Sequence, residues 1–284
     1  MKIKNNSILT TTMIVLLCTI AVGCSNVKQK VKLDKNSFTY LTQHVRVTVC
    51  GKTPTKGKYC WNGDSKQFSA SGSVIKHKEN FSYILTAGHF CNVDRTQVIQ
   101  ASVDPAFIDK TFTRLENVEF ESFIEVQTAA GVAQRASVVA TNSELDICVL
   151  KTKRIDVVAL KLASNPPAYG SDVWNLASPL GITVPGSVPV LKGVYSGDAN
   201  LRGLNVSVIT DLPATFGCSG SPVLDQNGEI ISMIYSTNAR FDNLSYGVTL
   251  SNLRKFIDKT FVTNKNKVVT SGNTTVEVEE PEYD

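Results

Sequence analysis

Apolar and polar residues alternate in short runs along most of the chain from about residue 38. The run at 45–49 alternates, and the runs at 68–75 and 81–85 are separated by a charged turn. β-Branched and aromatic runs of this kind, divided by Gly, Asn and Lys turns, are typical of an all-β barrel or sandwich. Farther on, apolar residues recur at helical spacing: Leu250, Leu253, Phe256, Ile257 and Phe261. The pattern therefore predicts an all-β domain that ends in one helix, with Ser251 as its N-cap.

The first 24 residues follow a different pattern. Two lysines precede an apolar run, 13–22, which is too short to span a bilayer. Gly23 stands directly before Cys24, and this ending resembles a bacterial lipobox, in which the cysteine is lipidated after cleavage. An ordinary secretory signal and an uncleaved anchor are the alternatives. We expect a lipoprotein signal peptide at 1–24, a polar tether at 25–37, and a lipid on Cys24 that holds the protein to a bacterial membrane at the cell envelope.

Composition restricts the function without defining it. The chain has 284 residues, of which 42% are hydrophobic and 19% are charged, the balance of a globular protein with a sizeable core. Its formal net charge is only +4, which is too low to indicate a nucleic-acid partner. It has three histidines and no Cys-x-x-Cys pair, so zinc ligation is not predicted. We therefore expect no metal and no nucleic acid.

A serine between two glycines is the first candidate for chemistry. In the segment Gly217–Gly220, a tight turn would place backbone N–H groups beside the Ser219 hydroxyl, as in a nucleophile next to an oxyanion hole. A serine hydroxyl needs a base to take its proton and a third group to orient that base. His89 follows one apolar strand and Asp146 lies within another, which gives the order His, Asp, Ser. Each residue alone has an ordinary structural role, but together they predict acyl-transfer catalysis.

Three segments resemble motifs of the trypsin-like serine peptidases, most closely their bacterial HtrA and glutamyl-endopeptidase types. Thr86–His89 matches Thr-Ala-x-His, and Asp146–Leu150 matches Asp-(Ile/Leu)-Ala-(Val/Leu)-Leu. Gly217–Pro222 matches Gly-x-Ser-Gly-(Gly/Ser)-Pro. Because three motifs occur in the family's order, with the resemblance spanning about residues 38–262, the signal is specific.

The resemblance implies a fold with two six-stranded antiparallel β-barrels and a C-terminal helix. The first barrel is expected at about 38–160, the second at about 170–250, and the helix at about 251–262. The chain beyond it, 263–284, is polar and closes with a run of acidic residues, so a disordered acidic tail is predicted there.

The resemblance also implies an activity, that of a serine endopeptidase, a hydrolase that takes protein or peptide substrates and needs no cofactor. His89 is then the general base, Asp146 the group that orients it, and Ser219 the nucleophile. The backbone N–H groups of Gly217 and Ser219 are expected to form the oxyanion hole. Cys218 stands where relatives carry an Asp or Asn that braces this loop. A catalytically inactive protease-fold binding protein at the membrane surface is therefore the alternative function.

The substrate pocket can be placed by alignment on Ser219. It is predicted to involve Pro213, Thr215, Ile234 and Tyr235. Pro213 falls where trypsin types place aspartate, and Ile234 falls where glutamyl endopeptidases place a histidine. Cleavage after Arg, Lys or Glu is therefore not expected, and the prediction is a small or apolar P1 residue.

Five cysteines follow Cys24 in the mature chain. Cys50 and Cys60 close a short polar loop and are the predicted disulfide. Cys148 occupies a strand position that relatives fill with Ala, so we expect it to act as a small core hydrophobe. No partner is assigned to Cys91. Because five is an odd number, at least one thiol is expected to stay free.

The segment 92–135 is rich in acidic residues and is longer than the corresponding part of compact relatives. We predict an enlarged hairpin or loop here, with strands leading into Leu145. The acidic residues indicate a solvated face rather than a metal site, because charged side chains are mostly exposed.

Overall fold

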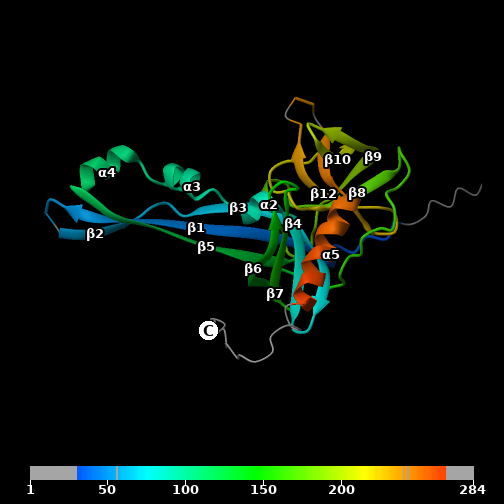
Figure 1. Cartoon of the computed structure of the whole chain (residues 1–284), viewed down its shortest axis with the longest axis horizontal. Coiled ribbons are helices and arrows are strands. Elements are labelled where there is room, and N and C mark those ends of the chain that lie inside the picture. The colour runs from blue at the N-terminus through cyan, green and yellow to red at the C-terminus, as the bar shows by residue number, and fades with distance from the viewer. Residues whose placement is uncertain (1–30, 56, 239, 242, 267–284) are drawn as a thin grey trace, which may run out of the picture. The chain divides into compact units, whose positions relative to one another are not determined.

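The computed structural model of the chain describes residues 31–55, 57–238, 240–241 and 243–266 (Figure 1). The described residues from Lys32 onward belong to one compact unit. The predicted signal peptide and the tail from residue 267 lie outside the described residues. Within them, no helix is long and apolar enough to cross a membrane.

The first sheet contains seven antiparallel strands: β1 (Phe38–Thr53), β2 (Gly57–Asn62), β3 (Lys66–Lys78), β4 (Phe81–Ala87), β5 (Arg114–Thr128), β6 (Ala133–Asn142) and β7 (Ile147–Lys153). Their order is β2-β1-β3-β4-β7-β6-β5, and β1 also pairs with β5. This pairing closes six of the strands into a ring. The seventh, β2, lies outside the ring along the outer half of β1.

The second sheet is a closed barrel of six strands: β8 (Asp172–Leu176), β9 (Val190–Leu201), β10 (Leu204–Thr210), β11 (Pro222–Leu224), β12 (Ile230–Thr237) and β13 (Ser245–Thr249). A 3₁₀ turn, η2 (Pro179–Gly181), follows β8. The last element, α5, runs from Leu250 to Asn266. The predicted all-β fold with two antiparallel barrels and a C-terminal helix is therefore confirmed.

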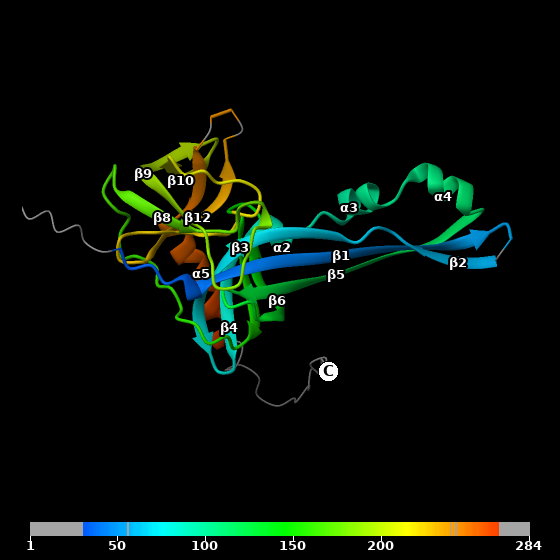
Figure 2. The same cartoon turned by 180° about the vertical axis from the view of Figure 1, so that it is seen from behind.

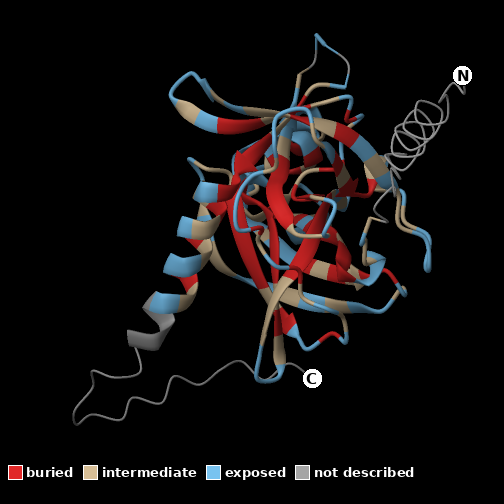
Figure 3. Cartoon of the chain, turned by 90° about the vertical axis from the view of Figure 1, so that its right-hand side faces the viewer, coloured by how far each residue is buried: buried red, intermediate tan, exposed pale blue. Residues whose placement is uncertain are grey.

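One apolar cluster joins the two barrels and the helix. Leu85 and Ile147 come from the first barrel, Met233 from the second, and Leu253 and Phe256 from α5. Figure 3 shows how the buried residues concentrate in the strands. Burying a side chain of this size contributes about 1.5–3 kcal/mol, so this shared cluster fixes the barrels against each other. The loops at the interface of the barrels are thereby held in fixed positions relative to one another.

A long extension leaves the first barrel. β1 has 16 residues and β5 has 15, so each spans roughly 50 Å at 3.3 Å per residue. Their outer halves, with β2 and two short helices, form what we call the arm, residues 46–62 and 92–121 (Figures 1 and 2). The helices are α3 (Arg95–Ser102) and α4 (Pro105–Thr111).

The arm has a small core, made by residues from β1, both helices and the segment after α4: Val47, Val49, Val98, Ile108 and Phe112, with Val45 at the base of the arm. The sequence predicted only an enlarged hairpin or loop at 92–135, and missed both helices. Each helix begins at an aspartate whose carboxylate accepts backbone N–H groups, Asp94 for α3 and Asp104 for α4.

Candidate active site

His89 and Asp146 meet where β4 and β7 end side by side. β4 leads directly into α2 (Gly88–Cys91), which carries His89, and Asp146 directly precedes β7. The Asp146 Oδ2 atom lies 2.7 Å from His89 Nδ1, and Oδ1 accepts the His89 backbone N–H at 2.6 Å. The histidine side chain is 52% exposed and the aspartate only 20%, so the imidazole can reach a substrate while the carboxylate orients it from below.

Local backbone geometry explains the residue types at this junction. Asp146 has a φ of 54°, in the left-handed region that Asp tolerates better than most residues. A Cβ atom on Gly88 would lie 2.9 Å from the Ile147 nitrogen and 3.0 Å from Asp146 Oδ1. The glycine before His89 therefore allows the carboxylate to approach the helix.

Two further links join the segment that carries His89 to the strands on either side of Asp146, one to β7 and one to β6. A disulfide joins Cys91 to Cys148, so the expectation that Cys148 is only a small core hydrophobe is wrong. The pairing places one bridge two residues after His89 and two residues after Asp146. The Asn92 side chain also donates to Thr141 Oγ1 at 3.0 Å. The histidine and aspartate segments are thus joined covalently.

The loop before Ser219 has two carbonyls bound to other segments and two backbone N–H groups without a backbone acceptor in the described part of the chain. The Phe216 carbonyl accepts the Leu180 N–H at 2.6 Å, and the Gly217 carbonyl accepts the Ser71 hydroxyl at 2.7 Å. Both carbonyls therefore point away from the site. Gly217 has a φ of 88°, and among the backbone hydrogen bonds of the described residues neither its N–H nor that of Ser219 is a donor. Two unused donors beside a serine hydroxyl are the requirement for an oxyanion hole.

A buried serine in β3 braces this loop. Besides bonding the Gly217 carbonyl, Ser71 donates its own N–H to the Ser219 carbonyl at 2.8 Å, and its Oγ accepts the Ser178 N–H at 3.0 Å. Both Ser71 and Ser178 are fully buried. Sequence reasoning expected weak bracing because Cys218 replaces a polar residue. The structure supplies the brace from the first barrel instead.

We expect Ser71→Ala to lower kcat/KM at least roughly tenfold, because losing an oxyanion donor outright costs about 10²–10³-fold in comparable sites. The substitution leaves the Gly217 carbonyl and the Ser178 N–H unpaired in a buried place. Ser73→Ala is the matched control, since that buried hydroxyl in the same strand has no partner among the described residues. Equal activity of the two variants would contradict the bracing role.

Cys218 adjoins the serine but is poorly suited to be the nucleophile. Its side chain is buried, with 1% exposed, and its thiol is the free one predicted from the odd cysteine count. Burial raises the pKa of the Cys218 thiol above its ordinary value, although a backbone hydrogen bond at Thr215 opposes the change. The reactive form of cysteine is the thiolate, so this group is held in its unreactive state.

His89 and Ser219 line one cavity of about 740 Å³ between the barrels. Among the hydrogen bonds of the described residues none joins their side chains, as is common before substrate tightens a catalytic site. Three of the predicted pocket residues, Thr215, Ile234 and Tyr235, line the same cavity, and Pro213 does not. Burial raises the pKa of Tyr235, and the Asp146 charge raises it further, so its hydroxyl stays neutral.

The cavity extends beyond the predicted pocket wall. Phe216, 86% exposed, belongs to that wall in the loop before Ser219, whereas Phe68 on β3, also exposed, lies outside it. The root of the arm contributes Asn92, Asp94 and Gln97. The sequence did not indicate Asn92, Asp94 and Gln97 as lining residues, because the segment 92–135 was predicted only as an enlarged hairpin or loop.

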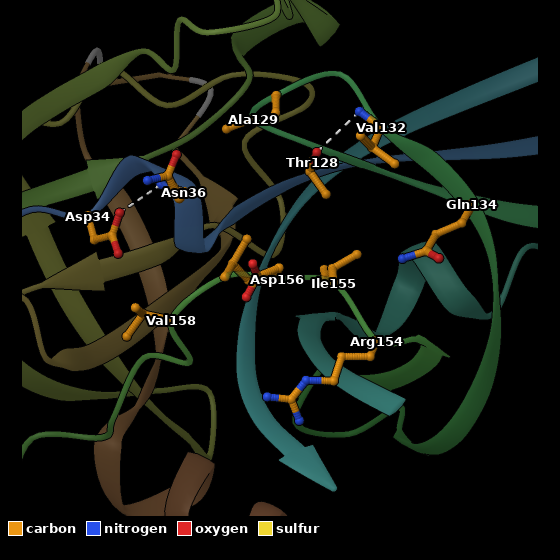
Figure 4. A pocket seen from close by; sticks show the side chains of 12 residues that line it. Asp34, Asn36, Thr128, Ala129, Val132, Gln134, Arg154, Ile155, Asp156 and Val158 are labelled. Atoms are coloured by element: carbon orange, nitrogen blue, oxygen red, sulfur yellow. Dashed lines mark hydrogen bonds between the residues drawn. The ribbon is translucent and has the colours of Figure 1, made fainter. Parts of the chain in front are cut away.

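A second pocket, of about 470 Å³, shares no lining residue with the first (Figure 4). It lies between the segment just before β1, the β5–β6 turn and the segment after β7, and its polar residues include Asp34, Arg154 and Asp156. The Asp34 carboxylate accepts the Asn36 N–H at 3.0 Å and caps η1 (Lys35–Ser37). This pocket lacks a nucleophile with a base beside it.

The double barrel, with its cleft at the interface, has the fold of the trypsin-like serine proteases. The chain belongs to the Trypsin-like peptidase domain family, whose profile matches residues 70–233, more than half of the chain. No curated protein sequence matches it.

Solved structures with the same fold are distant in sequence. The active form of the Rv3671c protease from M. tuberculosis is 17% identical, with a TM-score of 0.50, and the match covers 76% of this chain and 80% of that one. A serine endoprotease from Yersinia pestis is also 17% identical, with a TM-score of 0.53 and coverage of 84% and 67%. The HtrA-type protease AlgW, solved with a tripeptide, is 14% identical, with a TM-score of 0.53 and coverage of 82% and 62%.

Proposed function

We propose that this protein is a serine endopeptidase in which Ser219 is the nucleophile, His89 the general base and Asp146 the group that orients the histidine. The observation that carries the proposal is the combination of a carboxylate-held imidazole with two unused N–H groups beside the serine. A turn that merely reversed the chain would not need both.

The geometry supports a two-step acyl transfer. His89 takes the hydroxyl proton as Ser219 Oγ attacks the scissile carbonyl, and the oxyanion that forms accepts the N–H groups of Gly217 and Ser219. His89 then donates that proton to the leaving amine, which departs and leaves an acyl-enzyme. Water, deprotonated by the same imidazole, releases the acid and restores the serine. Asp146 stabilises the imidazolium in both steps.

We expect a small or apolar P1 residue. The part of the cavity wall that comes from the second barrel includes Thr215, Ile234 and Tyr235, which carry no charge to pair with a basic or acidic side chain. A peptide library should therefore be cleaved mainly after small or apolar residues, with modest selectivity, because one methylene is worth only about 1–3 kcal/mol in such a pocket. Dominant cleavage after Arg, Lys or Glu would overturn this preference.

We also propose that a lipid on Cys24 anchors the protease in a bacterial cell envelope. The sequence around Cys24 supports this proposal, and Cys24 itself lies outside the described residues. Labelled palmitate should enter the protein in cells and should not enter a Cys24→Ala variant. Equal incorporation into both proteins would exclude this anchor.

A fluorophosphonate probe provides the test of the proposed catalysis. The protein starting at Ser25 should be labelled, and Ser219→Ala should not, because the probe reacts only with an activated serine. Cys218→Ser is the control for the neighbouring thiol and should be labelled like the wild type. A folded sample that takes no label would instead favour the inactive binding protein.

A further inference from the structure

The end of the arm carries three cations in one row. Lys52 in β1 pairs directly with Lys58 in β2 on one side and with Arg114 in β5 on the other. Directly opposite residues of an antiparallel sheet point to the same face, with Cβ atoms about 4.5–5.5 Å apart. All three residues are exposed.

This row is unfavourable in the isolated protein. Like charges directly opposite each other destabilise a sheet. Within the described residues the ion pairs are Lys78–Glu79, His89–Asp146 and Lys192–Asp172, and none of them neutralises the row. The segment Cys50–Cys60 contains three lysines and no acidic residue. Such an uncompensated row is suited to an anionic partner.

The row is also held in place before any partner arrives. The Cys50–Cys60 disulfide closes the hairpin that carries Lys52 and Lys58, and it confirms the pairing predicted from the sequence. The arm core lies beneath the same strands. A preorganised surface loses less entropy on binding than a flexible one.

The other face of the same end is apolar. The neighbouring row consists of Tyr59, Gly51 and Leu115. The Tyr59 ring stacks on Phe112 of the arm core, with 6.0 Å between the ring centroids, and Leu115 is 49% exposed. A soluble polyanion would contact only the cations. A bilayer surface with anionic lipids accepts Lys and Arg at the headgroups and Tyr and Leu at the acyl boundary.

We propose that the end of the arm is a docking surface for the phosphate headgroups of an anionic bilayer. The cations Lys52, Lys58 and Arg114 contact the headgroups from one face of the sheet. Leu115, on the opposite face of the same end, enters the interface when the arm inserts end first. The surface is separate from the proteolytic cleft and does not depend on the lipid at Cys24.

The test measures partitioning onto vesicles by the chain that starts at Ser25, which lacks Cys24. Both barrels, both disulfides and all the apolar clusters lie in the compact unit Lys32–Asp284, so this chain keeps the complete fold. The protein should bind vesicles containing phosphatidylglycerol and not those of phosphatidylcholine alone. Binding should weaken as salt rises, because salt screens exposed charges.

The combined variant Lys52→Gln, Lys58→Gln and Arg114→Gln should bind about a hundredfold more weakly, since each cation near an anionic surface contributes about 1 kcal/mol. Its melting temperature should not fall, because repulsion is removed. Lys153→Gln, Lys161→Gln and Lys255→Gln together form the control, with the same change in net charge at other exposed sites. Equal losses in the two variants would show a non-specific charge effect and overturn the proposal.

Leu115→Ser separates a bilayer from a soluble polyanion. It should weaken vesicle binding several-fold and leave binding to polyphosphate unchanged. If polyphosphate binds as tightly as vesicles, and Leu115→Ser changes neither affinity, the partner is a soluble phosphate polymer. That outcome would overturn the assignment to a bilayer. Neither vesicle binding nor polyphosphate binding depends on catalysis by Ser219. A failure of the proposed docking can therefore be distinguished from a failure of the proposed proteolysis.

Discussion

Asp146→Asn is expected to lower kcat by about 10⁴-fold with little change in KM, the size of loss seen when the orienting carboxylate of such a triad becomes an amide. The carboxylate accepts two donors at once, the His89 ring at 2.7 Å and the His89 backbone N–H at 2.6 Å. An amide has one acceptor oxygen, so it can serve only one of them. If the oxygen keeps the backbone bond, the amide NH₂ faces Nδ1 and selects the tautomer that cannot take the serine proton.

Asparagine is chosen because it preserves the backbone. Asp146 has a φ of 54°, which Asn adopts nearly as readily and Ala does not, so the loss can be attributed to chemistry. Asp172→Asn is the control, because it makes the same change in charge at an exposed carboxylate that pairs with Lys192. A loss below tenfold for Asp146→Asn would mean that this carboxylate does not orient the base.

The sequence allowed the candidate catalytic elements to be located because their signals are local. An apolar strand followed by a small-residue turn fixes where His89 stands, and a glycine-flanked serine fixes a turn. The Cys50–Cys60 pair was also predictable, since it closes a hairpin of adjacent strands. In each case the residues that make up the signal lie within a dozen positions of one another.

The arm and the oxyanion brace depend on contacts distant in sequence. Ser71 and Gly217 are 146 residues apart, and the sequence around neither residue indicates the hydrogen bond between them. The α4 helix did carry a local signal, because Asp104 followed by Pro105 is a typical N-cap and first position. The prediction of an enlarged hairpin or loop used only the acidic composition and the length of the segment, and did not use this signal.

Removal of the Cys91–Cys148 disulfide should reduce both stability and activity. Its cysteines are 57 residues apart, so loop-closure entropy assigns the bridge about 4 kcal/mol. For a domain of this size the loss corresponds to a fall of roughly 8–16 °C in Tm. We expect Cys91→Ala with Cys148→Ala to show this shift in thermal unfolding, and to lower kcat at temperatures well below the new Tm.

The Cys50–Cys60 bridge is the matched comparison. Its separation of 10 residues gives about 3 kcal/mol by the same argument, so Cys50→Ala with Cys60→Ala should also lower Tm. It lies at the end of the arm, however, and kcat toward a short peptide should stay unchanged. The two variants therefore differ in activity far more than in stability if the Cys91–Cys148 bridge holds the histidine helix against the aspartate strand. Equal kcat values in the folded state would show that the His89–Asp146 hydrogen bonds maintain that geometry without the bridge.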